Sequence, residues 1–378
     1  MRRVIRIVLW IALILVILSV VLVRHRYGGG EPYRDVTGAS ILSDDELETV
    51  LGYPEPIGNV AVSEDGRGFF TVHPESRPAG AKLLEFRDGV AWPYPDEALQ
   101  DDLFQTPLGV VIDRQNRLWI IDHGKHGFDT PRLVAIDLLT DEVAHNHSFN
   151  NTAAPGGSFL QDLQVSPDGR TVFIADASFW RKDPAIIVHD VRTFTDRRVL
   201  EDDPSVSAQD WIIQTPSKKM TFFGGLAAMK PGIDGIAVTP DGLWLAYGAM
   251  SHDTLYRVPT EALLDKSLGD PAIASRVEAL GRKPLSDGLS ADVEGGIWIT
   301  DVEHGAVLRM APDGTLETWI ETPRIRWADA LSFGPGGWLY LADSAIPDQV
   351  MRSKRHIASQ APYFIFRFRP GVDGVPGQ

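Results

Sequence analysis

One motif occurs six times along this chain, and it constrains the fold more than any other feature of the sequence. Each copy joins a short alternating apolar stretch, a turn tetrapeptide and a second apolar stretch, as in "IDGIAVTPDGLWLAYG" from Ile233 and "SDGLSADVEGGIWITD" from Ser286. Period-two alternation on both sides of a turn is typical of a β-hairpin. The turns begin at residues 63, 113, 166, 239, 292 and 334. The sequence therefore predicts a repeat protein built on six hairpins.

The spacing of the copies selects the architecture. Successive turns are separated by 50, 53, 73, 53 and 42 residues, and a four-stranded propeller blade occupies about 40–50 residues. Six blades close a ring and leave no exposed sheet edge. We therefore predict an all-β, six-bladed β-propeller over residues 31–378, with "YFIFRFRP" near the C-terminus as a closing strand. The longest interval holds an insertion around 201–232, for which a loop over one face and a simple surface excursion both remain open.

The first thirty residues form a separate segment. An uncharged apolar run, Ile7–Val23, has arginines on both sides. Its length is at the short end of the range for a membrane-spanning helix. A cleavable signal usually has a shorter apolar core and a small-residue cleavage site. We predict that residues 1–30 are an uncleaved anchor with a flexible "GGGEP" tether. Residues 7–23 would then lie in the membrane, with the propeller outside the cytoplasm, periplasmic or extracellular; cleavage would instead give a secreted protein.

Composition excludes some functions. The formal net charge is -15, with 51 Asp and Glu against 36 Lys and Arg. Such a surface repels phosphate backbones, so we expect no nucleic-acid partner. The chain has no cysteine, which excludes thiol catalysis, thiolate metal sites and disulfides.

Several motifs carry a family resemblance. "RLWIIDHG" (117–124), "DGIAVTPDGLWLAYGAMSHDTLYRVPTEALL" (234–264) and "WADALSFGPGGWLYLADS" (327–344) resemble, in the same order, segments of the major royal jelly and insect yellow proteins. The resemblance covers most of residues 50–370, and gluconolactonase-type propellers are more distantly similar. It implies an exported six-bladed propeller. Family members variously bind small aromatic amines, convert dopachrome-type compounds or serve structural and nutritive roles, so membership leaves the ligand open.

Acidic residues gather at one predicted end of the channel. The first strand of each blade should line the channel, and the second strand should return to the same face. Any single Asp at a loop end commonly caps backbone amides. Three of them, Asp234, Asp287 and Asp329, open the first strand of their hairpins in one column. Several acids in one column favour a binding site, and the small residues after them should leave room for a ligand. The predicted ligand-binding residues are Asp234, Asp287, Asp329, Asn59, Asp162, Asp301, His304, Asp122 and His123.

Two ligand classes fit such a mouth. One is a hard cation such as Ca²⁺, with Asp234 and Asp287 as metal ligands. The gluconolactonase pattern implies a Glu where this chain has Gly58 and an Asn where it has Asp234, so that metal site is incomplete. The other class is a small organic cation stacked on aromatic side chains. The candidate aromatics are Trp180, Trp211, Phe222, Phe223, Tyr247 and Trp327.

The sequence therefore leaves three functions open. We expect a membrane-anchored propeller that binds a small catechol-like or amine-like molecule. The alternatives are a divalent-metal-dependent lactonase and a non-catalytic interaction scaffold. No nucleophile and base can be paired from the sequence, and catalytic residues stay unassigned.

Overall fold

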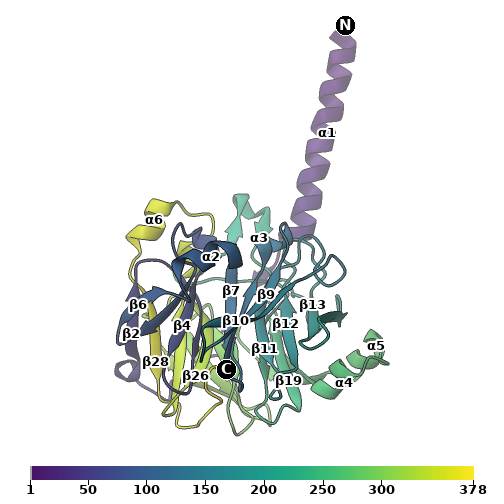
Figure 1. The fold of residues 1–378 in the computed structure, drawn as a ribbon. Helices are drawn as coiled ribbons and strands as arrows, with labels where there is room; N and C mark the ends of the chain where they lie inside the picture. The colour runs from purple at the N-terminus through teal and green to yellow at the C-terminus, as the bar shows by residue number, and fades with distance from the viewer. Residues whose placement is uncertain (1) are drawn as a thin grey trace.

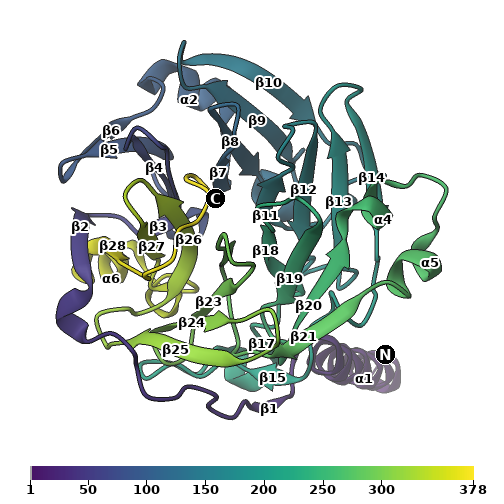
Figure 2. The ribbon, with the colours of Figure 1, turned by 90° about the horizontal axis from the view of Figure 1, so that it is seen from below.

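The computed structural model describes residues 2–378 and shows six four-stranded antiparallel sheets arranged around a channel (Figures 1 and 2). From the channel outward, the first three blades are β3 (Ile57–Val62), β4 (Gly68–Val72), β5 (Leu83–Arg87) and β6 (Val90–Pro93); β7 (Pro107–Ile112), β8 (Arg117–Asp122), β9 (Arg132–Asp137) and β10 (Glu142–Ser148); and β11 (Leu160–Val165), β12 (Thr171–Asp176), β13 (Ala185–Asp190) and β14 (Thr195–Val199). The last three are β18 (Ile233–Val238), β19 (Trp244–Ala249), β20 (Thr254–Pro259) and β21 (Glu278–Arg282); β22 (Leu289–Ala291), β23 (Ile297–Asp301), β24 (Ala306–Met310) and β25 (Leu316–Glu321); and β26 (Ala328–Gly334), β27 (Trp338–Asp343), β28 (Tyr363–Phe368) and β2 (Glu48–Tyr53). The predicted six-bladed propeller is confirmed.

The innermost strands are the hairpins' first strands, as the repeat predicts. Each contacts the next first strand around the ring, and β26 contacts β3 to close it. They are buried along most of their length, whereas the outer strands β10 and β21 are largely exposed. The "PDG" turns use glycine at a positive φ, as at Gly169 (69°) and Gly242 (73°), where other residues would be strained. Every innermost strand leads into its hairpin turn in the same direction along the channel. All six hairpin turns therefore lie on one face of the ring, and the mouth lies on the other.

The two ends of the chain complete the ring in ways the sequence did not predict. The "YFIFRFRP" segment does form a strand, β28, but the outer strand of its blade is β2 from the N-terminal side. The C-terminal tail enters the channel from the face of the hairpin turns (Figure 2). Gly377 N–H donates to the Phe333 carbonyl and Phe333 N–H donates to the Gln378 carbonyl, both at 2.8 Å. The tail therefore plugs the channel opposite the mouth.

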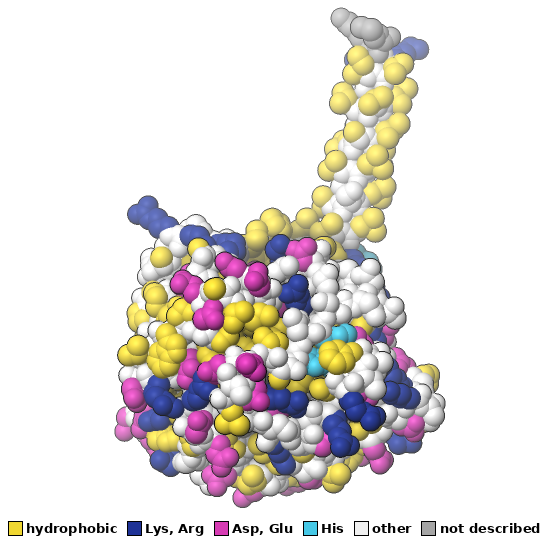
Figure 3. Space-filling model, viewed as in Figure 1, with side chains coloured by type: hydrophobic (Ala, Val, Ile, Leu, Met, Phe, Trp, Pro, Cys, Tyr) yellow, Lys and Arg dark blue, Asp and Glu magenta, His cyan; other side chains and the backbone are white. Residues whose placement is uncertain are grey.

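A long helix, α1 (Arg2–Tyr27), stands on the mouth face (Figures 1 and 3). Within the described residues it is the helix long and apolar enough to cross a membrane, and its span of Arg3–Tyr27 is unburied. Its place near the N-terminus fits a signal sequence or an anchor of an exported protein. The glycines after the helix lie against the propeller. A Cβ on Gly28 would lie 2.7 Å from the Leu226 carbonyl, and one on Gly30 would lie 2.7 Å from the Asp210 carbonyl, because the glycines let the chain pack closely here.

The insertion at 201–232 lies over the mouth face, which decides between the two alternatives. It contains β15 (Trp211–Ile212), which pairs with β1 (Glu31–Pro32), and a hairpin of β16 (Thr221–Phe222) and β17 (Ala227–Ala228) joined by η3 (Phe223–Gly225). Its Ile213 and Met220 are buried in one cluster with Leu285, Trp327 and Ile346 of the last three blades. The insertion is therefore a lid over this side of the channel. The remaining short helices are η1 (Asp44–Glu46), η2 (Pro74–Ser76), α2 (Glu97–Leu103), α3 (Gly124–Gly127), α4 (Thr260–Leu264), α5 (Asp270–Ala274), η4 (Ile346–Asp348) and α6 (Lys354–Ser359).

Candidate functional site

The innermost strands open at β-bulges that face the mouth. The pairing register shifts between Leu160 and Leu163 in β11, between Ile233 and Ile236 in β18, and between Ala328 and Ala330 in β26. A bulge leaves a residue out of the ladder and can redirect its side chain. The bulged positions carry Asp162, Asp234 and Asp329, and Asp287 stands just before β22. Four consecutive blades thus each contribute one acid.

These four residues, named here the acid cluster, lie together. The charge of Asp287 acts on Asp234 and Asp329, and that of Asp162 acts on the other three. Asp234, Asp287 and Asp329 expose only 2%, 6% and 7% of their surface. Asp234 accepts a hydrogen bond from Gln161 Nε2 (3.0 Å), and Asp287 accepts one from Trp327 Nε1 (2.6 Å). The structure therefore brings together Asp234, Asp287 and Asp329 with Asp162, all four of which are among the predicted residues.

Burial sets the protonation of the acid cluster. It raises the pKa of Asp162 and of Asp287 to about 7. Burial first, and the charge of Asp287 second, raise the pKa of Asp234 and of Asp329 well above the usual range. Mutual repulsion is thus a smaller cause than desolvation. Without a cation, burial therefore favours the protonated form of these carboxyl groups.

One carboxylate oxygen in the cluster lacks a partner. Among the described residues, the buried Asp329 Oδ2 makes no hydrogen bond, and neither does the buried hydroxyl of Ser344, whose interaction with Asp329 partly offsets the rise that burial causes in the pKa of that carboxyl. The imidazole of His73 lies nearby, with Nε2 3.7 Å from this oxygen. Since His73 Nδ1 accepts a bond from the Glu75 amide (3.2 Å) and burial lowers the pKa of His73 to about 4, the neutral ring carries its proton on Nε2. Gln161 Oε1 is also buried without a partner in this part of the chain. Unpaired buried oxygens are costly unless a ligand satisfies them.

The small residues beside the acids do not leave room for a ligand, contrary to the prediction. A Cβ on Gly235 would overlap the Asp287 carbonyl, and one on Gly288 would overlap the Asp329 carbonyl. The glycines are needed because neighbouring innermost strands approach closely at the narrow end of the ring. Asn59 and Asp162 line a cavity of only about 10 Å³ beside Gln378, which is about the space of one water molecule.

The acids that end the second strands have a different arrangement. Asp122 accepts bonds from the amides of Gln105 (2.5 Å) and Gly124 (2.9 Å). Asp301 accepts bonds from the Glu303 amide (2.8 Å) and from His304 Nδ1 (2.9 Å). Both are almost fully buried. These carboxylates hold the loops at the mouth, which is the ordinary capping chemistry of Asp, and they lie outside the acid cluster.

The two predicted histidines occupy separate cavities. His123 lines a cavity of about 380 Å³ together with Glu75, Thr106 and His126, over the first two blades. His304 lines a cavity of about 230 Å³ between the last two blades. Burial lowers the pKa of His123 well below its usual value, whereas the hydrogen bond to Asp301 raises the pKa of His304 to about 9. Neither histidine belongs to the acid cluster.

A second polar group, which the sequence analysis did not find, lies between the second and third blades. Ligand atoms of His147, His189 and Asp196 lie within 4.8 Å of one another and could hold a metal ion. Asp196 accepts bonds from His147 Nε2 (2.8 Å) and His189 Nδ1 (2.7 Å). The two carboxylate oxygens are therefore also satisfied without an ion. The alternation of His145 and His147 along "HNHS" was the available signal.

Comparison with known families decides the relationship of the chain. A sequence profile described as "Major royal jelly protein" matches residues 105–319, more than half of the chain. The chain belongs to the major royal jelly protein family. Major royal jelly protein 2 of Apis mellifera is 25% identical over 259 residues, which are 64% of this chain and 48% of that protein. A 6-deoxy-6-sulfogluconolactonase of Pseudomonas putida is 33% identical over 103 residues, 27% of this chain and 33% of the enzyme. The chain spans less than half the length of the curated relatives it matches.

Solved structures place this family member among propellers of known fold. A gluconolactonase from Xanthomonas campestris superposes with a TM-score of 0.54 at 16% identity, covering 86% of this chain and 89% of that one. A regucalcin from Agrobacterium tumefaciens, described as a calcium-binding protein, gives 0.51 at 16% identity, covering 87% and 92%. At these identities the likeness shows the fold alone.

Proposed function

We propose that this royal-jelly-family propeller is an exported, membrane-anchored protein, with residues 1–30 as anchor and 31–378 as propeller, that binds a cation at the acid cluster. The observation that carries the proposal is Asp329 Oδ2, which has no hydrogen bond among the described residues, beside the buried Asp234 and Asp287 and the partly buried Asp162. A ring held together only by packing gains nothing from four desolvated acids. A bound cation would let them ionise and would supply the missing partner.

A small divalent ion of the calcium type fits this site better than an organic amine. Hard cations take carboxylate and amide oxygens as ligands, and the cluster offers carboxylates with Gln161 Oε1 beside them. The cavity at Asp162 has no room for an organic group. The first blade has Gly58 where the gluconolactonase pattern has a glutamate, and its contribution near the cluster is the neutral His73, so the ligand set differs from that pattern.

An organic ligand would instead occupy the 380 Å³ cavity over the first two blades. Its size is within the range of small-molecule sites. Glu75 and His126, 2.7 Å apart, offer a carboxylate and an imidazole there. His73, two residues from Glu75, stands next to Asp329, so the cavity and the acid cluster share a wall. A catechol-like or amine-like ligand is compatible with this chemistry.

Metal-assisted lactone hydrolysis is the second candidate function. The 103-residue match to a 6-deoxy-6-sulfogluconolactonase favours it. In that case a bound cation would polarise the ester carbonyl. Glu75 and His126 would hold the substrate and exchange protons with it from the cavity wall.

The test is thermal unfolding of the chelator-treated full-length protein in detergent, with Ca²⁺ or Mg²⁺ and with panels of amines, catechols and lactones. We expect Ca²⁺ to raise the melting temperature, and Asp329→Asn to weaken Ca²⁺ binding about 10- to 100-fold, since a charged contact contributes about 1.5–3 kcal/mol. Asp168→Asn, in a hairpin turn on the opposite face, should bind Ca²⁺ normally. If neither ion changes the wild-type melting temperature, the proposal is wrong. Indifference to every additive would favour the scaffold interpretation.

A further inference from the structure

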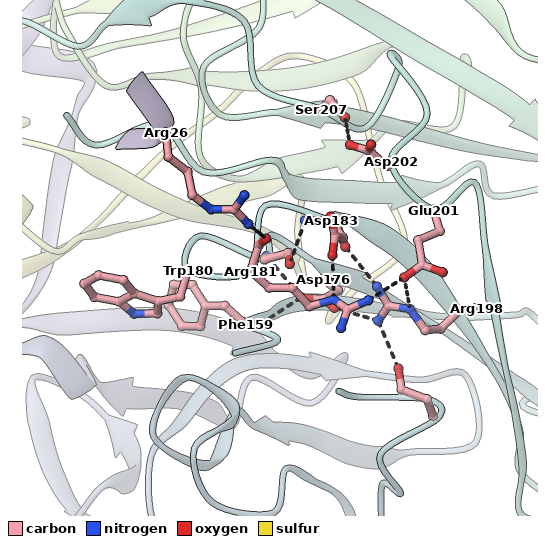
Figure 4. Close-up of polar contacts among 12 residues, drawn as sticks. Arg26, Phe159, Asp176, Trp180, Arg181, Asp183, Arg198, Glu201, Asp202 and Ser207 are labelled. Carbon is pink, nitrogen blue, oxygen red and sulfur yellow. Dashed lines mark hydrogen bonds and ion pairs between the residues drawn. The ribbon is translucent and has the colours of Figure 1, made fainter. Parts of the chain in front are cut away.

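The end of α1 is bonded directly to the mouth face. Arg24 Nη1 donates to the Gly225 carbonyl (2.9 Å), and Tyr27 OH donates to the Trp180 carbonyl (2.7 Å). Figure 4 shows Arg26 reaching from the helix to the carbonyl of Arg181 in the same loop as Trp180. Two loops far apart in sequence thus hold the last helical turn. The helix is therefore a rigid extension of this face, standing outward from it (Figure 1).

The loop at 177–184 is itself fixed to the third blade. Arg181 pairs with Asp183 (3.0 Å) and Glu201 (3.1 Å). Arg198 pairs with the buried Asp176 (2.7 Å) at the start of the loop (Figure 4). Lys230 Nζ donates to the Gly28 carbonyl at 2.8 Å and so ties the chain after the helix to the insertion. The attachment has several independent contacts and leaves little freedom of tilt.

Lengths place this attachment at the level of the lipid headgroups. The apolar run ends at Val23, and four helical residues from there to Tyr27 rise roughly 6 Å. The headgroup layer on each side of a bilayer is about 5–7 Å thick. Residues 24–27, and the loops bonded to them, therefore coincide with that layer when the run spans the hydrocarbon.

Two aromatic side chains at this level are open to solvent. Trp180 is 45% exposed, and its ring meets Tyr27 edge-on at 6.2 Å. Phe223 is 72% exposed and begins the η3 turn whose Gly225 accepts the bond from Arg24. Aromatic residues beside basic ones are typical of the membrane–water interface. Exposing the Trp180 and Phe223 side chains to water alone would not stabilise the protein, because apolar surface is favoured away from water.

We propose that the mouth face of this propeller rests on the lipid surface, with Trp180 and Phe223 inserted among the headgroups beside α1. The bilayer then lies over the lid, and the plugged face with the hairpin turns points away from the membrane. One consequence rests on the proposed function: an organic ligand that reaches the 380 Å³ cavity from the mouth comes along the bilayer surface, which favours an amphipathic molecule over a freely diffusing polar one.

The test uses the natural absence of cysteine. Phe223→Cys and Trp180→Cys in the full-length protein carry a nitroxide label, and the protein is reconstituted in vesicles of phosphatidylcholine and phosphatidylglycerol. The matched controls are Val293→Cys and Leu243→Cys, exposed apolar residues (57% and 60%) in hairpin turns of the opposite face. Power saturation compares collisions with oxygen, which concentrates in lipid, and with a water-soluble nickel chelate.

We expect the Phe223 and Trp180 labels to collide several-fold less with nickel and more with oxygen than the Val293 and Leu243 labels. Equal, water-like collision rates at all four positions would overturn the proposal. Phe223 is mostly exposed, so its variant keeps the test valid if Trp180→Cys fails to fold. Because no ligand or cation is added, a negative result would leave the cation site untouched, and loss of cation binding would leave the orientation untouched.

Discussion

Replacing Asp287 by Asn should stabilise the cation-free protein more at pH 8 than at pH 5. Asp287 is buried and has its pKa raised from 3.8 to about 7. The unfolded chain therefore releases this proton at a lower pH than the folded protein does, and folding stability falls as pH rises from about 4 through 7. The Asp287→Asn variant has no such loss, and its new amide oxygen can still accept the bond from Trp327 Nε1.

The size of the effect follows from the shift. At 1.36 kcal/mol per pKa unit, the ionisation of Asp287 costs about 4 kcal/mol at pH 8 and about 2 kcal/mol at pH 5. The advantage of Asp287→Asn over wild type should therefore grow by about 2–3 kcal/mol between these pH values. Bound Ca²⁺ should reverse the order at pH 8, because the carboxylate then has a counter-ion.

The assay is urea unfolding of chelator-treated, detergent-solubilised protein, followed by tryptophan fluorescence at pH 5 and pH 8. Asp168→Asn is the control. Its hydrogen bond from Ser166 lowers the pKa of Asp168, so its replacement should give the same change at both pH values. If Asp287→Asn destabilises the protein equally at pH 5 and pH 8, Asp287 is an ionised structural cap and the reasoning about burial fails.

Two further predictions concern the close approach of the innermost strands and the histidine group. Gly235→Ala should destabilise the protein by about 1–3 kcal/mol in the same urea assay, because the new Cβ would overlap the Asp287 carbonyl. The control is Gly80→Ala, whose Cβ meets open space and which should change stability by less than about 0.5 kcal/mol. Equal effects of the two substitutions would contradict this account. Zn²⁺ should raise the melting temperature of the chelator-treated wild type but not of His147→Gln. The control is His356→Gln, from an unrelated His–Asp pair, which should behave as wild type. Equal stabilisation of all three proteins would exclude the group of His147, His189 and Asp196 as the zinc site.

The fold was predictable because its signal is local and repeated. Each hairpin carries its own alternation and its own turn, with glycine in five of the six and Asn116 at the positive φ in the other, so six copies reinforce one interpretation. The closing strand β2 was not predictable in the same way. Its sequence, "ETVLGY", lacks a paired partner nearby, and its position depends on a partner more than 300 residues away, β28. The C-terminal plug is likewise a contact of backbone groups that leaves no side-chain pattern.

The candidate site was predictable only in part. The shared column identified Asp234, Asp287 and Asp329, because innermost strands repeat the same register. His73 was missed because it meets Asp329 only across the closure of the ring between the first and last blades. The glycines were misinterpreted as space, since a sequence does not show that a neighbouring carbonyl already fills it. Capping acids such as Asp122 and cluster acids such as Asp287 look alike in sequence, and only their partners distinguish them.

The insertion connects the anchor to the acid cluster. Its Gly225 carbonyl accepts the bond from Arg24 at the end of α1. Its Met220 is buried in the same cluster as Trp327, whose indole donates to Asp287. The insertion covers the side of the mouth over the last three blades, and it cannot move far without straining its bonds to the helix. In our proposal the helix end lies at the lipid surface. Movement of the insertion, which affects access to the acid cluster, is therefore coupled to the contact with the membrane. A membrane-bound protein should therefore exchange its cation at a different rate from the detergent-solubilised one.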